Sequence, residues 1–283
     1  MSEEVKPKNR KIPIAQLILI FWMLVFLACN FYPLVLMVFK SFKTPKQELY
    51  DPFSLTFPLN WENYSYAWLY VKDLISNTVL LTAANTLGAL FCASIAAYAF
   101  SRFSMPGKEY LFLGILSLMM IPGILTLCAS YLWVDKLGLV GTRWGVILPT
   151  VAGNMPFNIF LLRTFFNGLP KDLFEAAEID GASKIKQYAM IALPLSMPIV
   201  TTAGLWLVMQ SWNDIIWPRL ILAEEQLTIA TGLIPFTNDY FKLTGAYSAP
   251  MAGYVITSLP LIVIYLFTSK QYIAGMTSGA LKM

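Results

Sequence analysis

Six long stretches without a charged residue constrain the fold of this 283-residue chain more than any other feature. They cover residues 12–39, 74–101, 110–134, 144–162, 187–213 and 243–269, and no other charge-free stretch exceeds 13 residues. A charge at the centre of a bilayer costs about 2.5–3.5 kcal/mol, and about 20 apolar residues cross the hydrocarbon core. Each stretch therefore predicts one membrane-spanning helix, and none is long enough for two.

The composition agrees with a membrane protein and argues against other classes. Hydrophobic residues make up 57% of the chain and charged residues 13%, whereas a soluble domain carries about 25% charged residues. The basic residues are scattered, so we expect membrane lipid as the surroundings and no nucleic-acid partner. We therefore predict an all-α integral membrane protein in which six transmembrane helices form one unit.

Residue types that carry chemistry are rare in this sequence. Histidine is absent, which removes the commonest general base and the commonest metal ligand. Cys29, Cys92 and Cys128 lie in apolar stretches without metal-ligand spacing, so we interpret them as small hydrophobic residues. No GxxxxGK[ST] phosphate loop occurs in the chain. These observations predict that the chain is not an enzyme and that it holds no metal or cofactor of its own.

An even number of spans places both termini on the same side of the membrane. With the termini inside, the inner segments hold 12 Lys and Arg residues and the outer segments hold 8, which favours cytoplasmic termini. Lys40, Lys43 and Lys46 oppose this orientation. The chain then divides into a cytoplasmic leader (1–11), a first transmembrane helix (12–39), an extracytoplasmic connection (40–73), a transmembrane core (74–270) and a cytoplasmic tail (271–283).

Polar and small residues inside the spans mark further candidates. Asn154 and Asn158 lie four residues apart and share one face of the fourth span, where either hydrogen bonding between helices or the lining of a pathway explains them. Gln210 in the fifth span is another candidate for pathway lining. An alanine at every fourth residue of 89–97 predicts close helix packing. Three prolines are expected to interrupt and kink their spans: Pro122, Pro149 and Pro156.

The connection between the fourth and fifth spans carries the densest charge in the chain. Pro170 suits the first position of a helix and Asp172 suits its first turn. Gly181 can adopt the left-handed conformation that ends a helix, and Ser183 can cap the next one. Four apolar residues are expected on one face of the first helix: Leu169, Leu173, Ala176 and Ala177. We therefore predict two short helical pieces that meet at a bend, the first of them amphipathic.

Acidic residues accompany an alanine pair in this connection. Glu175, Glu178 and Asp180 lie beside alanines that are slim enough to enter a groove on another protein. This pattern describes a docking element, but an ordinary solvated loop helix explains the same residues. Physical reasoning alone leaves both interpretations open.

The connection also resembles the EAA signature of permeases from binding-protein-dependent ABC importers. The matching residues are Glu175, Ala176, Ala177, Asp180, Gly181, Ala182, Ile191, Leu193, Pro194 and Pro198. The resemblance extends over about residues 14–283 to the smaller permease subunit of maltose-type carbohydrate importers. It includes Ala-Ala-Tyr-Ala-Phe-Ser-Arg at 96–102, Ile121-Pro122, Trp212-Asn213 and Gly-Met-Thr-Ser-Gly-Ala at 275–280. Tyr188 is a departure, because the family often has Phe there.

The resemblance implies a type I ABC importer fold in the plasma membrane of a bacterium or archaeon. It implies that the EAA segment is a cytoplasmic coupling helix in a cleft of an ATPase, with Glu175 meeting a basic residue and Gly181 holding the bend. The implied coupling residues are Glu175, Ala176, Ala177, Asp180, Gly181, Ala182 and Pro194. The implied partners are a second related permease subunit, two ABC ATPase subunits that bind ATP and Mg²⁺, and an extracytoplasmic solute-binding protein that delivers a sugar.

Other transport classes remain as alternatives. An ABC importer for a non-sugar solute, such as an amino acid or phosphate, shares the EAA core. One half of an ion-coupled secondary transporter is expected to carry charged relay residues in mid-span, and the six stretches contain none by definition. A membrane enzyme needs a clustered catalytic constellation, which the sequence does not show.

Overall fold

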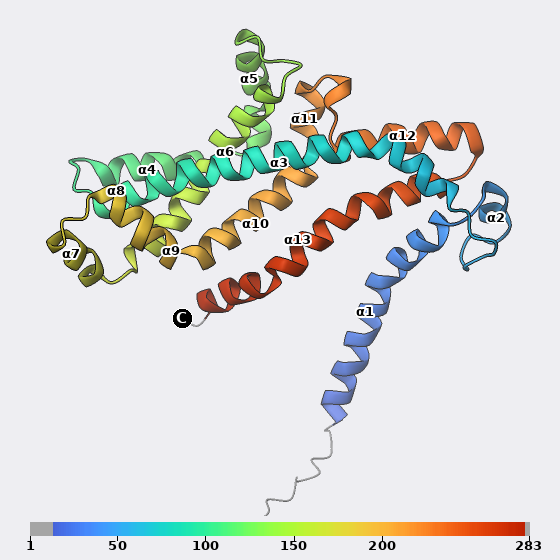
Figure 1. Ribbon diagram of the computed structural model, residues 1–283, viewed down its shortest axis with the longest axis horizontal. Coiled ribbons are helices and arrows are strands. Elements are labelled where there is room, and N and C mark those ends of the chain that lie inside the picture. The colour runs from blue at the N-terminus through green and yellow to red at the C-terminus, as the bar shows by residue number, and fades with distance from the viewer. Residues whose placement is uncertain (1–13, 281–283) are drawn as a thin grey trace, which may run out of the picture. The chain divides into compact units, whose positions relative to one another are not determined.

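The computed structural model describes residues 14–280, with side chains described as far as residue 269, and it is helical without a strand over that range (Figure 1). The first elements are α1 (Ile14–Ser41), α2 (Pro45–Tyr50), α3 (Glu62–Arg102), α4 (Lys108–Leu118), α5 (Gly123–Lys136) and α6 (Arg143–Asn167). They are followed by α7 (Lys171–Ile179), α8 (Lys184–Gln187), a π-helical turn η1 (Tyr188–Ala192), α9 (Leu193–Leu195) and α10 (Met197–Asn213). The last are α11 (Ile216–Ile221), a 3₁₀ turn η2 (Glu224–Gln226), α12 (Ile229–Thr244) and α13 (Ser248–Ala280).

The helices match the predicted membrane spans in number. In the described residues, α1, α3, α6 and the first 22 residues of α13 are each long and apolar enough to cross a membrane. Two further spans are bent pairs, Lys108–Leu118 with Gly123–Lys136 and Lys184–Leu195 with Met197–Asn213. The predicted number of six therefore holds when each bent pair is counted as one span.

The two bent spans differ in shape from the single helices expected there. Pro122 lies between α4 and α5, which meet at 97°, so the kink predicted at this proline is confirmed. The second bend of 77° lies between Pro194 and Pro198. A proline lacks the N–H that would continue the helical ladder, which explains both breaks. By contrast, α6 continues through Pro149 and Pro156, so the interruptions expected there are not observed.

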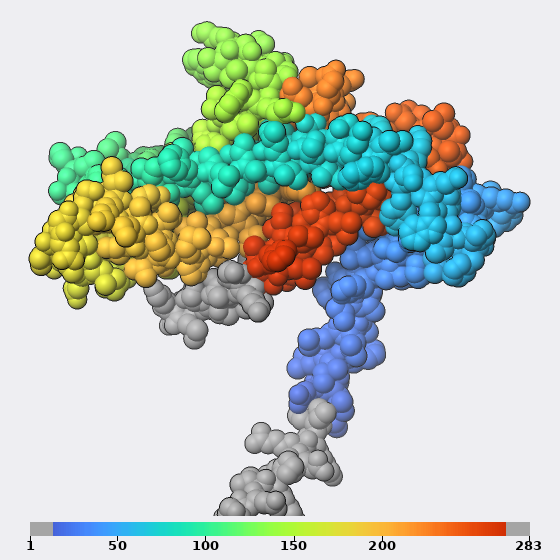
Figure 2. Space-filling view, viewed as in Figure 1, coloured from blue at the N-terminus to red at the C-terminus, as the bar shows by residue number. Residues whose placement is uncertain are grey.

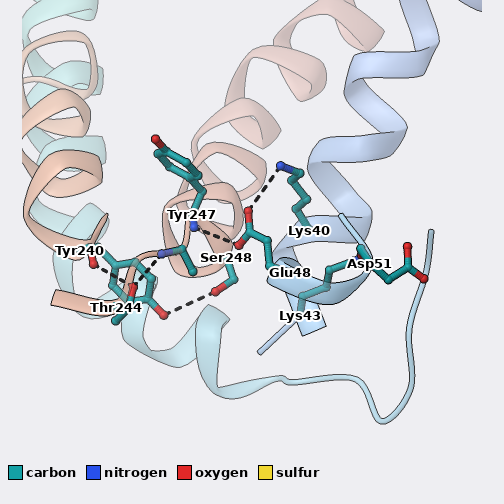
Figure 3. Close-up of polar contacts among 9 residues, drawn as sticks. Lys40, Lys43, Glu48, Asp51, Tyr240, Thr244, Tyr247 and Ser248 are labelled. Carbon is teal, nitrogen blue, oxygen red and sulfur yellow. Dashed lines mark hydrogen bonds and ion pairs between the residues drawn. The ribbon is translucent and has the colours of Figure 1, made fainter. Parts of the chain in front are cut away.

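The chain forms two compact units, which we describe separately. The first unit contains residues 14–67 with 239–255, and the second contains 68–238 with 256 onward. In the first unit, Glu48 of α2 pairs with Lys40 at 3.4 Å and accepts the backbone N–H of Tyr247 at 2.9 Å (Figure 3). Lys43 is fully buried and donates to the carbonyl oxygen of Asp51. Lys40 and Lys43, which opposed the predicted orientation, thus hold the connection after α1 in place.

The second unit is organised around the C-terminal half of α3. Ala89, Ala93 and Ala97 are fully buried, so the predicted packing stripe is confirmed. One apolar cluster contains Ala93, Ala97, Tyr98, Ile159, Leu162, Phe166, Phe174 and Ala192. A second cluster contains Leu81, Val134, Val146, Ile147, Trp217 and Ile221. Helix α6 contributes to both clusters, because Val146 and Ile147 lie near its start while Ile159, Leu162 and Phe166 lie near its end.

Candidate functional site

The charged connection folds as two short helices that meet at a bend, as predicted. Helix α7 begins at Lys171, one residue after the position expected for it, and Asp172 lies in its first turn. Gly181 follows with a φ of 76°, the left-handed conformation that glycine adopts without a steric penalty. The Ser183 side chain accepts the backbone N–H of Lys186, so the predicted cap of α8 is confirmed.

The structure shows which side of α7 is buried. Phe174 is the buried residue of this helix, with Leu169 and Ala177 half-buried beside it. Leu173 and Ala176, two of the four apolar residues predicted to share one face, are exposed. A nine-residue helix with apolar residues on two sides can pack through either side, and the aromatic ring removes the larger apolar area from water.

Arg102, at the end of α3, contacts the buried side of α7. Its guanidinium carbon lies 3.8 Å from the centre of the Phe174 ring. The Nη2 atom donates to the carbonyl oxygens of Phe166 at 2.8 Å and Leu169 at 3.2 Å, where α6 ends. A cation at a helix C-terminus also interacts favourably with the helix dipole. The sequence analysis assigned no role to Arg102. The feature that could have indicated one is its position as the charged residue that ends the second apolar stretch.

The residues after the bend are anchored to α3 as well. The Tyr188 hydroxyl lies 2.7 Å from the Ser94 hydroxyl, and the Tyr188 ring centre lies 5.3 Å from that of Tyr98. Gln187 is buried and donates to the carbonyl oxygen of Ala182 at 3.1 Å. The segment 171–188 is therefore attached to α3 on both sides of its bend, and the departure at Tyr188 adds a hydrogen bond to this attachment.

The outer surface of this segment carries the residues singled out in the sequence (Figure 2, yellow). Glu175, Ala176, Asp180 and Gly181 are exposed, Ala177 and Ala182 are half-buried, and Pro194 is exposed in α9. Two isoleucines that the sequence analysis did not select are almost fully exposed, Ile179 at 88% and Ile185 at 80%. Glu178 and Lys184 form an ion pair across the bend. We call the surface made by Glu175, Ala176, Ile179 and Asp180 the docking face.

A polar cavity of about 560 Å³ lies between α6 and α10 in the second unit. Its lining residues are Thr150, Gly153 and Asn154 of α6, Gln210, Ser211 and Asn213 of α10, and Asp214. Asn154 and Gln210, two of the three candidates for pathway lining, thus share one cavity. Asn158 does not line it, because this side chain is fully buried and donates to the carbonyl oxygen of Asn154 at 2.8 Å.

The amides of α6 bond to their own helix. Asn154 donates to the carbonyl oxygen of Thr150 at 2.9 Å, four residues earlier, as Asn158 does to Asn154. The Oδ1 atom of Asn158 has no partner among the described residues. Asn154 thus lines a cavity and Asn158 is buried, and the lining of a pathway by either residue stays a prediction.

Asp214 supplies the one charged group of the cavity lining. Its Oδ1 atom accepts the backbone N–H of Trp217 at 3.3 Å, so it also fixes the start of α11. Burial raises the pKa of Asp214, and the backbone N–H groups of Trp217 and Ile216 act in the opposite direction.

Comparisons with known proteins agree with this architecture. Residues 89–273 match the model of a family described as the binding-protein-dependent transport system inner membrane component. The trehalose/maltose transport system permease protein MalG of Thermococcus litoralis is 31% identical over 89% of this chain and 91% of its own length. The galactooligosaccharides transport system permease protein GanQ of Bacillus subtilis is 31% identical over 84% of this chain and 82% of its own.

The fold is also found in a solved structure. A chain from a bacterial ABC transporter involved in the import of the acidic polysaccharide alginate superposes with a TM-score of 0.80 and 21% identity, over 91% of this chain and 96% of that one. The family match covers well over half of the chain, and the relatives align over most of their length. The chain is therefore a member of the binding-protein-dependent transport system inner membrane component family.

Proposed function

We propose that this chain is the permease subunit of an ATP-driven importer and forms half of a transmembrane pathway for a sugar or oligosaccharide. In this proposal the segment 168–194 docks into a separate ATPase, which binds the ATP and Mg²⁺. The observation that carries the proposal is the docking face, an exposed surface with apolar and acidic residues on a helix that packs against α3 and α6. The named relatives, whose solutes are trehalose, maltose and galactooligosaccharides, support a sugar as the solute.

The exposure of the docking face supports a protein partner. Full burial of an isoleucine side chain is worth about 1.5–3 kcal/mol, and Ile179 is almost fully exposed. Small residues at 176 and 177 allow a partner to approach the helix closely. Glu175 and Asp180 lie exposed beside these apolar residues and can pair with basic groups. An apolar centre with charges around it is the usual composition of a protein interface.

The packing beneath the docking face supports its role in transmission. Phe174 and Ala192 belong to the same apolar cluster as residues of α3 and α6. Packed cores move as rigid bodies because they do not deform continuously. A displacement of α7 by the ATPase is therefore passed to the spans that it packs against, which rock between inward and outward states.

The remaining parts of the assembly follow from the same proposal. A second related permease subunit completes the pathway, and two ATPase subunits drive it. An extracytoplasmic solute-binding protein delivers the sugar, which is supported by a solved alginate transporter in complex with a pentasaccharide-bound periplasmic protein. We place the docking face, the leader (1–11) and the tail (271–283) on the cytoplasmic side, and the leader lies outside the described residues.

The docking role is tested by reversing one charge of the docking face. Glu175→Lys is expected to lower ATP-driven sugar uptake by at least about tenfold and to reduce co-purification of the ATPase, because the new charge repels the basic groups that Glu175 pairs with. Glu62→Lys, the same reversal at the exposed start of α3, is the control and should keep both properties. Membrane insertion is checked for both variants by extraction of the membrane fraction.

Two outcomes would overturn the proposal. One is Glu175→Lys protein that still transports and hydrolyses ATP in a coupled manner. The other is labelling of a cysteine at position 179 from outside intact cells, since that result would place the docking face away from a cytoplasmic ATPase.

A further inference from the structure

A second, smaller cavity adjoins the polar cavity between α6 and α10. It measures about 160 Å³ and shares Thr150 with the larger cavity. Its other lining residues are Gly123, Thr126, Leu127 and Ser130 of α5, Pro149 of α6, and Trp217 of α11. Residues from four helices, α5, α6, α10 and α11, therefore line two cavities that meet at Thr150.

Trp217 contributes a largely buried ring to the lining of the smaller cavity, because its side chain is only 8% exposed. Thr126, Ser130 and Thr150 line the same cavity.

The lining of both cavities suits an uncharged, hydroxyl-rich molecule. Amides and hydroxyls both donate and accept hydrogen bonds, as the hydroxyls of a sugar do. The indole adds an apolar surface with a polar edge. The volume of the larger cavity falls within the range of about 300–1,000 Å³ that is usual for small-molecule sites.

The charge in the lining of the larger cavity is negative. Asp214 contributes a carboxylate, and neither cavity is lined by Lys or Arg among the described residues. An ionised carboxylate accepts hydrogen bonds from sugar hydroxyls but repels another anion. Asp214 also accepts the backbone N–H of Trp217, so the same residue sets the charge of the cavity and positions the indole.

We propose that the larger cavity, with the smaller one beside it, binds an uncharged sugar unit in transit and that Asp214 makes this site select against acidic sugars. The proposal rests on the sugar-import function and names the class of sugar. A solved relative by fold belongs to an importer of an acidic polysaccharide. Because that importer carries an acidic substrate on the same fold, the fold itself cannot exclude acidic sugars. In this proposal the exclusion comes from the cavity residues of this chain.

The cavity charge is tested with thiol reagents at an introduced cysteine. Gly153 lines the larger cavity, and a Cβ atom built there meets nothing within 4 Å, so Gly153→Cys is accommodated. Cys29, Cys92 and Cys128 are first replaced by Ala. The complete importer is then labelled with 2-hydroxyethyl methanethiosulfonate, which is neutral, and with 2-sulfonatoethyl methanethiosulfonate, which is an anion.

Asp214→Asn is expected to lower the ratio of neutral to anionic labelling rates at Gly153→Cys by about tenfold, since local fields change ion concentrations by about 10–1,000-fold. Asparagine keeps an oxygen that can accept the backbone N–H of Trp217. Asp214→Glu keeps the charge and should therefore retain the ratio. Gly114→Cys on α4 is the matched control, because its Cβ also meets nothing and it does not line either cavity. Its ratio should not respond to Asp214→Asn. If the ratio of labelling rates at Gly153→Cys is the same with and without the charge at position 214, the proposed selectivity is wrong.

Occupancy is tested by protection of the same cysteine. Maltotriose at high concentration is expected to slow the labelling of Gly153→Cys several-fold, whereas trigalacturonate should slow it less. Equal or stronger protection by trigalacturonate, or no protection by either, would overturn the site. These results can be told apart from the test of the importer function. The importer function is contradicted if Glu175→Lys leaves coupled uptake intact, and that outcome does not depend on the labelling at position 153.

Discussion

The middle and the C-terminal end of α6 have opposite environments although they belong to one continuous helix. Near its middle, Thr150, Gly153 and Asn154 line a polar cavity. Near its end, Leu162 and Phe166 are fully buried in the cluster that also holds Phe174 of α7. At a rise of 1.5 Å per residue, Asn154 and Phe166 lie about 18 Å apart along the axis.

One helix can therefore serve two sites. The polar middle of α6 leaves room for a solute, whereas its packed end leaves none and so transmits displacement. We expect changes at the packed end to alter coupling without altering the charge selectivity of the cavity, and changes at the polar middle to do the reverse.

The largest effect is expected from Phe174→Ala at the packed end. Removing a buried aromatic ring costs about 3–5 kcal/mol, and α7 would lose its attachment to the cluster of α3 and α6. Uptake and ATPase co-purification should be lost, while the labelling ratio at Gly153→Cys is kept. Phe160→Ala, which removes an exposed ring from α6, is the control. Coupled uptake by the Phe174→Ala protein would show that α7 does not need this anchor.

Arg102→Met should have the next largest effect. It removes two hydrogen bonds from a charged donor, each worth about 1.5–3 kcal/mol, together with the contact on the Phe174 ring. Thermal unfolding of the complex in detergent should begin at a lower temperature, and coupling should weaken. Arg102→Lys keeps the charge without the planar guanidinium and should give an intermediate value. A lysine variant worse than the methionine variant would contradict this account.

Gly145→Ala probes the start of α6. A Cβ there would clash with the carbonyl oxygen of Leu139 and lie 2.8 Å from Cγ2 of Ile221. Overpacking of this kind costs about 1–3 kcal/mol. Because Ile221 shares a cluster with Trp217, labelling at Gly153→Cys should change while ATPase co-purification stays at the wild-type level. The control is Gly114→Ala on α4, whose Cβ meets nothing, and equal behaviour of the two variants would refute the close packing.

Tyr188→Phe should have the smallest effect of the series. It removes the hydroxyl that lies 2.7 Å from Ser94, a hydrogen bond worth about 0.5–1.5 kcal/mol. Ser94 retains its bond to the carbonyl oxygen of Phe91, so it is not left without a partner. A small decrease in melting temperature and uptake within twofold of wild type are expected. A tenfold loss of uptake would assign the hydroxyl a role in coupling.

Much of the fold could be predicted because charge is expensive in lipid. The charge-free stretches located all six spans, and Pro122 located one of the two bends. The bend near Ser196 was not predicted, since the flanking Pro194 was interpreted only as part of the EAA signature. Similarly, Gly181 and Ser183 were assigned correctly because their effects are local and depend only on adjacent backbone.

The site was predicted less completely because its contacts join distant parts of the chain. The buried side of α7 could not be assigned from spacing, since only the neighbouring helices distinguish Phe174 from Leu173. The role of Arg102 depends on carbonyl oxygens that are 64 and 67 residues away in the sequence. Asn154 and Asn158 looked equivalent, yet only Asn154 reaches the cavity.

The membrane segments, the bend in the charged connection and the family signature can be read from the chain alone, because these properties depend on local composition and backbone preference. The buried side of α7, the arginine that anchors it and the polar residues around a cavity became known only from the fold. Those outcomes depend on which helices pack together, and the free energy of packing is shared among residues that the linear order of the chain keeps far apart.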